Sequence, residues 1–420
     1  MRVEMLRRRI AKLFRLQVIL WVLFAYELMM HMIPDELSIE NGDLDAVSLQ
    51  VPVRLECEDT GSRVIDTAAV VSNDSTENDA RIVQNQVDLT AKLFGLIPVK
   101  NVSANVVDQQ SLQVSGENIG LYVQTNGVMV IGTGEFTDAG HNRYSPAQNV
   151  LKAGDYICAV DGVSVTDKEA LVARIEQSDG KAVTLSVRRN GELLELYIQP
   201  RPDEQGKYKI GVWVRDDLAG IGTLTFIDSS GRFGALGHCI SDMDTGIQME
   251  IAEGRLYCST IVDIVKGKDG EPGQLSGVIN YDEKYQLGVI DDNSGQGVYG
   301  LMYSDSPLLE ECMVYPVGYK QDILLSDAEI LCNLEGTIKP YHIVIQEIRY
   351  QEDRANKSIL FEVDDERLLN MTGGIVQGMS GSPIIQNGKI IGAVTHVFIQ
   401  DSSKGYGIFI ENMLKEERKG

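Results

Sequence analysis

The segment that decides the fold spans residues 373–385, GGIVQGMSGSPII. Its centre has the pattern G-x-S-G-x-P, which places Ser380 on a tight turn between Gly378 and Gly381, just before an apolar strand. A nucleophilic hydroxyl needs an exposed turn, and flanking glycines let backbone N–H groups converge on the oxyanion that it forms. We therefore expect Ser380 to be a nucleophile, with an oxyanion hole made by the N–H groups of Gly378 and Ser380. The alternative is an ordinary hairpin turn rich in glycine and serine.

A base for that serine is available upstream, at His238 in the phrase GALGH. The chain has only five histidines in 420 residues, so few positions can supply a histidine base. The one in this glycine-rich phrase is therefore a candidate. A histidine that precedes the serine fits the chymotrypsin-like order, whereas in the hydrolase elbow the serine comes first. His396 could also approach the site, but its place in an expected strand favours a structural role.

Residues 201–420 contain many short β-type runs and little helical periodicity. The runs are 222–227, 288–290, 343–348, 358–363, 384–385 and 390–394, and only 411–419 has the pattern of a helix. Many short strands favour a barrel or a sandwich. Together with the His–Ser order, they predict a mainly β fold whose C-terminal domain is a chymotrypsin-like double β-barrel.

The middle of the chain, 145–175, reads SPAQNVLKAGDYICAVDGVSVTDKEALVARI. It predicts a short helix after Pro146, a turn, the buried strand YICAV and a helix capped by Thr166 or Asp167. Asn190-Gly191 then predicts a type I′ hairpin. This order resembles a bacterial PDZ domain, an α+β module that captures peptides by strand addition.

The resemblance also implies a carboxylate-binding loop at Gly120-Leu121-Tyr122-Val123, ahead of an expected strand at 128–131. By analogy, its backbone N–H groups would hold a chain end or an internal segment. An ordinary strand start is the alternative, because any glycine before an apolar strand looks similar.

The charge is distributed unevenly. The chain has 38 Lys and Arg against 61 Asp and Glu, a net charge of −23, yet its first 15 residues carry +5. An acidic body repels phosphate backbones, so we expect no nucleic-acid partner. The basic tip leads into the apolar run 16–33, long enough to cross a bilayer as a helix. Positive charge on its N-terminal side predicts an anchor that exports the rest of the chain. A cleaved signal peptide and a soluble helix are the alternatives.

Four segments follow from these patterns: a cytoplasmic tip and anchor (1–35), an exported strand and polar linker (36–92), a PDZ domain (93–200) and a serine peptidase domain (201–420). A strand is expected at 46–57, and 58–84 is polar enough to be a linker. No pair of the six cysteines has C-x-x-C spacing, so we expect neither a metal nor another cofactor.

Four phrases carry a closer resemblance: AGIGTLTFID (219–228), FGALGHCISDMDTG (233–246), TGGIVQGMSGSPIIQNGKIIGAVTHVF (372–398) and GYGIFIENML (405–414). They resemble the stage IV sporulation protein B family, membrane-associated serine peptidases of endospore-forming bacteria. The resemblance implies an enzyme in the space between the two forespore membranes. It would cleave itself, then cleave a regulatory subunit of a membrane-embedded protease complex, which releases processing of a late sigma factor. A catalytically silent PDZ scaffold that holds a membrane complex is the rival.

The resemblance makes Ser380 the nucleophile, His238 the base and Asp365 the acid of a triad. The spacing is unusual, because Asp365 precedes Ser380 by only 15 residues, whereas double barrels normally supply the acid from the first barrel. Asp291 or Asp292, and also Asp244, therefore remain open as alternatives. Met379 stands where trypsin-like enzymes have the Asp that pairs with a new N-terminus. Activation must use another route, and the PDZ domain is the candidate.

Overall fold

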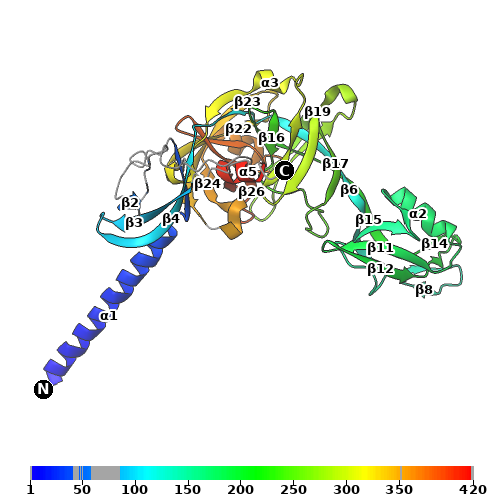
Figure 1. Ribbon diagram of the computed structural model, residues 1–420, viewed down its shortest axis with the longest axis horizontal. Helices are drawn as coiled ribbons and strands as arrows, with labels where there is room; N and C mark the ends of the chain where they lie inside the picture. The colour runs from blue at the N-terminus through cyan, green and yellow to red at the C-terminus, as the bar shows by residue number, and fades with distance from the viewer. Residues whose placement is uncertain are drawn as a thin grey trace, which may run out of the picture.

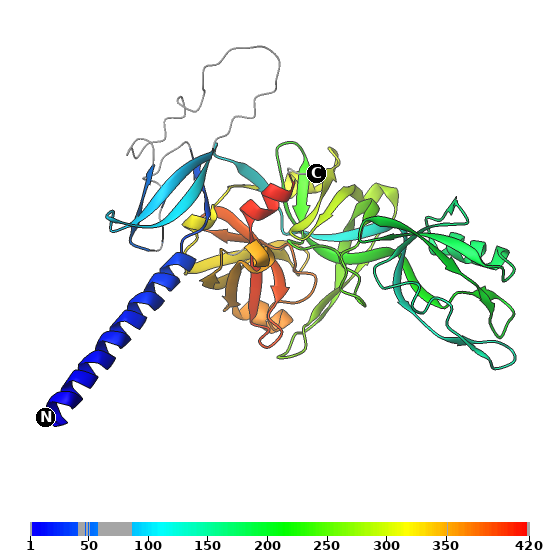
Figure 2. The same ribbon diagram turned by 60° about the horizontal axis from the view of Figure 1, so that its bottom comes forward.

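The computed structural model describes residues 2–40, 47, 49, 51–57, 86–350 and 352–417. It contains a long N-terminal helix, a small sheet, two β-barrels and a separate lobe at the far end (Figures 1 and 2). The predicted linker at 58–84 lies outside the described residues. The predicted strand at 46–57 is present in part, as β2 (Val53–Cys57).

The helix α1 (Arg2–His31) leads directly into the small sheet. The strand order is β1 (Glu36–Glu40), β4 (Ile97–Val107), β3 (Gln86–Leu93) and β2, and β1 runs parallel to β4. One cluster of apolar side chains joins the sheet to the last turn of α1 through Met29, Met30 and Ile33. The small sheet is therefore packed onto the end of α1.

Six strands form the first barrel, which closes because β6 pairs with both β17 and β15. In order around the ring they are β6 (Asn118–Thr133), β17 (Ile251–Val265), β19 (Gln286–Ser294), β20 (Gly297–Met302), β16 (Arg232–Ala235) and β15 (Val212–Ile227). Three further strands extend it: β5 (Ser111–Val114), β21 (Met313–Pro316) and β18 (Gln274–Ile279). Inward-facing Leu121, Leu224 and Phe233 belong to its buried core.

The second barrel is also closed and has six strands. They are β22 (Asp327–Asn333), β23 (Ile338–Ile348), β24 (Ile359–Val363), β27 (Lys404–Phe409), β26 (Lys389–Val397) and β25 (Pro383–Gln386). The C-terminal helix α5 (Ile410–Glu417) places Met413 and Leu414 in an apolar cluster shared with Phe226 of the first barrel. The predicted mainly β double barrel is confirmed.

The far lobe has the elements predicted for a PDZ domain. The strand β9 (Tyr156–Val160) is followed by α2 (Lys168–Gln177), whose N-cap Asp167 accepts a hydrogen bond from Ala170 N. The hairpin of β11 (Val183–Arg189) and β12 (Glu192–Ile198) turns at Asn190-Gly191, where φ is +50° and +82°. The remaining pieces are β7 (Phe136–Thr137), β8 (Arg143–Tyr144), β10 (Val163–Ser164), β13 (Arg201–Pro202) and β14 (Tyr208–Lys209). The residues after Pro146 form turns, not the expected short helix.

One point of the arrangement differs from the prediction: the PDZ lobe is inserted into the first barrel and does not precede it. The 16-residue strands β6 and β15 pair with each other in both units. Their pairing from Asn118 to Gln124 belongs to the barrel, and their pairing from Met129 to Thr133 belongs to the lobe. The boundaries 93–200 and 201–420 therefore do not separate the two units. The order of motifs along the sequence does not reveal an insertion, because β6 and β15 each continue from one unit into the next through an irregularity in their pairing between Arg215 and Asp217.

Candidate active site and peptide groove

Ser380 lies in the loop that joins α4 (Glu366–Thr372) to β25. This loop, residues 373–382, is called the nucleophile loop below. Gly378 has φ +101° and Gly381 φ +98°, conformations that favour glycine. A Cβ on Gly381 would lie 2.0 Å from the carbonyl oxygen of Thr223 in β15. The glycines therefore let the loop touch the first barrel.

The first barrel holds the nucleophile loop through two threonines of β15. Thr223 N donates to the carbonyl oxygen of Ser380 at 2.9 Å, and Thr223 Oγ1 donates to that of Gly378 at 2.9 Å. Thr225 Oγ1 donates to the carbonyl oxygen of Gly381 at 2.8 Å. The nucleophile loop thus belongs to the second barrel in sequence but is fixed by the first.

The hydroxyl of Ser380 donates to the carbonyl oxygen of Thr395 at 2.7 Å. Thr395 is the extra residue of a bulge in β26, where the pairing with β27 shifts between Val394 and His396. Such bulges re-aim groups near active sites. In this arrangement the hydroxyl hydrogen of Ser380 is not directed at His238.

His238 follows β16 in a segment that contacts the same bulge, since a Cβ on Gly237 would lie 2.8 Å from Cγ2 of Thr395. The Nδ1 of His238 lies 2.9 Å from the carbonyl oxygen of Cys239. A carbonyl only accepts, so Nδ1 carries the hydrogen and Nε2 keeps its lone pair. Burial lowers the pKa of His238. The imidazole is therefore a neutral base at neutral pH, in the tautomer that removes a proton through Nε2.

His396 joins this group, although its strand position suggested a structural role. Its ring centroid lies 5.0 Å from that of His238, with the planes inclined by 43°. Its Nδ1 is buried and has no hydrogen-bond partner among the described residues. Burial, His238 and Lys357 lower the pKa of His396 to about 4, so it is neutral beside the base. The bulge at Thr395 brings this ring to the site, and a bulge leaves no clear sequence signal.

Asp365, the expected triad acid, has other partners. It is the N-cap of α4, where it accepts from Arg367 N at 2.9 Å, and it also accepts from Arg367 Nη2 at 2.6 Å and His342 N at 3.2 Å. The Arg367 guanidinium holds the pKa of this carboxyl well below its usual range. Among the described residues, the partner of His238 Nδ1 is the carbonyl of Cys239, not a carboxylate. The structure therefore does not bring Asp365 to the base.

Two of the alternative acids, Asp291 and Asp244, are also engaged elsewhere. Asp291 makes two hydrogen bonds with the guanidinium of Arg232, at 2.9 and 3.0 Å. Burial raises the pKa of Asp292. Asp244 pairs with Arg215 at 3.0 Å. A backbone carbonyl orients His238 here, and a sequence search for side-chain acids does not find such a group.

The expected oxyanion hole is compatible with the geometry. Met379 N donates to Val376 O at 3.2 Å and Gly381 N donates to Val394 O at 2.7 Å. The intervening N–H groups of Gly378 and Ser380 donate to no described residue. Two unpaired donors on either side of Met379 suit a developing oxyanion.

The predicted peptide-binding loop at Gly120-Leu121-Tyr122-Val123 is wrong. These residues lie in the middle of β6, where Gly120 pairs with Ile221 of β15 and with Tyr257 of β17. The same holds for the other three, so their backbone groups are used by strands on both sides. The sequence around Gly120 does not indicate this pairing, because β17, one of the two neighbours of β6 in the first barrel, lies more than 130 residues downstream.

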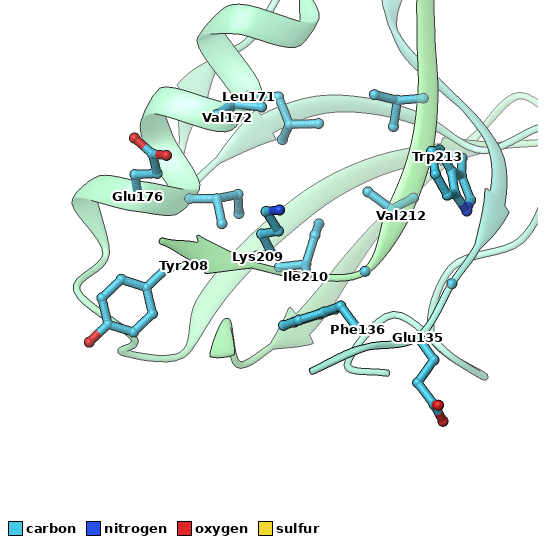
Figure 3. A pocket seen from close by; sticks show the side chains of 14 residues that line it. Glu135, Phe136, Leu171, Val172, Glu176, Tyr208, Lys209, Ile210, Val212 and Trp213 are labelled. Carbon is cyan, nitrogen blue, oxygen red and sulfur yellow. The ribbon is translucent and has the colours of Figure 1, made fainter. Parts of the chain in front are cut away.

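A groove suitable for a peptide lies elsewhere on the PDZ lobe, between α2 and the start of β15 (Figure 3). It is a cavity of about 400 Å³ with apolar walls made by Leu171, Ile175, Ile210, Val212 and Val214. In this part β15 pairs with β6 on one side, and among the described strands none pairs with its other edge. A peptide strand would add there. The signal that sequence reasoning missed is Ile210-Gly211-Val212, in which Gly211 has φ +71°.

Two β-barrels, a serine and a histidine at their junction and an inserted PDZ domain are the features expected of a serine endopeptidase. Residues 206–414 match the family model described as SpoIVB peptidase S55, and residues 143–189 match a PDZ domain model. The chain belongs to the SpoIVB peptidase family.

Other similarities are partial. A putative zinc metalloprotease of Xylella fastidiosa is 33% identical over 94 residues, which cover 22% of this chain and 20% of that protein. The chain thus spans about a fifth of the length of the curated relatives it matches first. Among solved structures, the PDZ domain of an SdrC-like protein from Listeria monocytogenes is 24% identical, covering 22% of this chain and 90% of that one, with a TM-score of 0.18. The HtrA-type protease AlgW with a decapeptide is 10% identical, covering 73% and 65%, with a TM-score of 0.31.

Proposed function

We propose that this protein is a membrane-anchored, exported endopeptidase that first cleaves itself. It then cleaves a regulatory protein of a membrane-embedded protease complex and so signals activation of a late sporulation sigma factor. The peptidase chemistry is supported by the position of Ser380 and of the segment before His238 on the same bulge at Thr395, next to the N–H groups of Gly378 and Ser380, which donate to no described residue. The sporulation role rests on membership of the family.

In the proposed reaction, Ser380 first turns its hydroxyl from Thr395 towards Nε2 of His238. His238 takes the proton as the Ser380 oxygen attacks the scissile carbonyl, and the N–H groups of Gly378 and Ser380 bind the oxyanion. The carbonyl of Cys239 holds the positive imidazolium through Nδ1–H. His238 gives its proton to the leaving amine, and water then hydrolyses the acyl-enzyme with His238 again as base.

The PDZ groove is proposed to regulate this step, because its wall and the active site share β15. The strand that lines the groove at Val212–Val214 continues to Thr223, which binds the nucleophile loop. Between them, Arg215 forms ion pairs with Asp242 and Asp244, on the loop that follows His238. A peptide added to β15 would therefore act on the nucleophile and on the base through one strand.

The first turn of α2 is tied to the same strand. Asp216 is buried, and it accepts hydrogen bonds from Lys168 N at 2.8 Å and Lys168 Nζ at 3.0 Å. The two walls of the groove, α2 and β15, are therefore joined by hydrogen bonds next to Arg215. A change in the width of the groove would therefore displace Arg215, which anchors the loop that follows His238.

Membrane attachment is proposed through α1. Among the described residues, one helical segment, Lys12–His31, is long and apolar enough to cross a membrane; none of it is buried, and Met29 and Met30 at its end contact the small sheet. The basic residues before it would stay on the cytoplasmic side. Self-cleavage is proposed between Asp35 and Leu93, which would cut the covalent link between this helix and the body.

The test compares self-cleavage of the wild-type chain with that of Ser380→Ala after membrane reconstitution. The proposal expects wild-type fragments that are missing from the variant. If both chains fragment equally, or if neither does while both are folded, the silent PDZ scaffold becomes the better account.

A further inference from the structure

The turn between β3 and β4 carries a cluster of exposed apolar side chains. Phe94 is 68% exposed, Leu96 is 82% exposed and Ile97 is 58% exposed. They flank Gly95, whose φ of +72° suits the tight turn. Consecutive large apolar side chains at the tip of a hairpin are unusual on a surface that faces only water. We call residues 94–97 the hairpin tip.

The strand register places the hairpin tip beside the end of α1. Glu36, the first residue of β1, pairs with Ser103 of β4, and β1 runs parallel to β4 away from α1. Ile97 precedes Ser103 by six residues, so β4 extends back towards the helix by about 20 Å at ~3.4 Å per residue. In both views the end of the sheet that carries this turn projects to the same side as α1 (Figures 1 and 2).

Side-chain contacts fix this position. Lys100 Nζ donates to the carbonyl oxygen of Ile33 at 2.6 Å and to that of Met30 at 3.5 Å, at the end of α1. Leu93 and Val99 belong to the same apolar cluster as Met29 and Met30. The candidate membrane segment ends at His31, so the hairpin tip lies at the depth where the bilayer surface would be.

The charge near the hairpin tip also suits a lipid surface. The side chain of Arg54 lies against Gly95, with its Cδ 3.1 Å from where a Cβ on that glycine would stand. Lys92 and Lys100 lie on the adjoining strands, each paired with one carboxylate, Glu56 or Asp35. Basic side chains next to an exposed apolar patch favour contact with anionic headgroups.

We propose that the hairpin tip inserts into the outer leaflet of the bilayer that holds α1, as a second membrane contact. The inference rests on the proposed anchor. It deepens that function, because β3 and β4 follow the 58–84 segment. A cut in that segment would leave the hairpin tip on the C-terminal fragment, which would keep its own contact with the membrane surface.

The test uses tryptophan quenching by brominated phospholipids in vesicles of phosphatidylcholine and phosphatidylglycerol. All chains are full length and carry Ser380→Ala, so that the result does not depend on peptidase activity. The native tryptophans are Trp21 in α1 and Trp213 in the PDZ lobe. Trp21→Phe removes the first, and Leu96→Trp then places a reporter in the hairpin tip.

We expect the Trp21→Phe/Leu96→Trp chain to lose about half of its emission, since one of its two indoles would lie in the interface. The matched control is Trp21→Phe/Leu193→Trp, because Leu193 is 72% exposed on β12, and no quenching is expected there. If Leu96→Trp is quenched no more than Leu193→Trp while Trp21 of the parent chain is quenched, the hairpin proposal is wrong and the anchor stands. If Trp21 is not quenched either, both the anchor and the hairpin proposal are contradicted.

Discussion

The hydroxyl oxygen of Ser380 lies 2.7 Å from the carbonyl oxygen of Thr395 and donates its hydrogen bond there. Thr395 is itself fixed, since its Oγ1 lies 2.6 Å from the carbonyl oxygen of Asn356, to which it donates, and 3.1 Å from that of Tyr406. The single hydroxyl hydrogen of Ser380 is donated to Thr395 and is therefore not available to His238. The structure thus represents a resting arrangement. Catalysis requires Ser380 to rotate towards His238.

Acid pH should inactivate the enzyme only below the ordinary range of histidine. Burial lowers the pKa of His238 from its usual value of about 6.5. The base form therefore persists to lower pH, and the acid limb of kcat/KM should have its midpoint below 6.5. A pH–rate profile of peptide cleavage measures it. A midpoint at or above 6.5 would show that the imidazole is not buried as described.

His396 should make folding stability depend on pH. Its pKa is lowered to about 4, so between about 6.5 and 4 the unfolded chain binds a proton that the folded chain does not. Stability should therefore fall as the pH falls through this window. Thermal unfolding at several pH values should show a smaller fall for His396→Gln. An equal fall in both proteins would assign the pH dependence to other groups.

Replacing Asp365 should affect stability more than chemistry. Asp365→Ala removes the N-cap of α4 and its pair with Arg367, at a cost of about 1 kcal/mol. Asp365→Asn keeps the cap and should change kcat by less than about tenfold, whereas loss of a triad acid costs about 10⁴-fold. Arg367→Gln is the control, because it removes the same ion pair. A 10⁴-fold loss in Asp365→Asn with unchanged melting temperature would restore the triad assignment.

Thr223 should support the oxyanion hole from the first barrel. Thr223→Val keeps the shape of the side chain but removes the hydrogen bond to the carbonyl of Gly378. Since a hydrogen bond contributes about 1 kcal/mol, kcat should fall roughly fivefold with little change in KM. Thr137→Val, which removes an exposed hydroxyl bonded to Glu204, should leave both constants unchanged. A rise in KM with kcat unchanged would place Thr223 in substrate binding instead.

Much of the fold could be predicted from the sequence. The strand YICAV, the cap at Asp167 and the Asn190-Gly191 hairpin depend on local rules of alternation, capping and turn geometry, and all three are present. Glycine-rich phrases mark Ser380 and His238 as candidates. These features are encoded within a few residues of where they act.

The rest depends on contacts between distant segments. Nothing in the sequence near Gly120 indicates that β6 pairs with both β15 and β17, so the sequence alone predicts a free backbone there. The orienting group of His238 is a carbonyl, which every residue has, and the approach of His396 depends on a bulge. Asp365 looked catalytic by resemblance, yet its neighbour Arg367 and the first turn of α4 use its oxygens.

The most direct test of the central claim is the reaction of the full-length chain with a fluorophosphonate, mapped by mass spectrometry. The account predicts an adduct on Ser380 that forms in the wild type and is lost in His238→Ala, in a protein with an unchanged melting temperature. It also predicts that Asp365→Asn keeps the adduct. An adduct on another serine, or none on Ser380 in the folded chain, would contradict it.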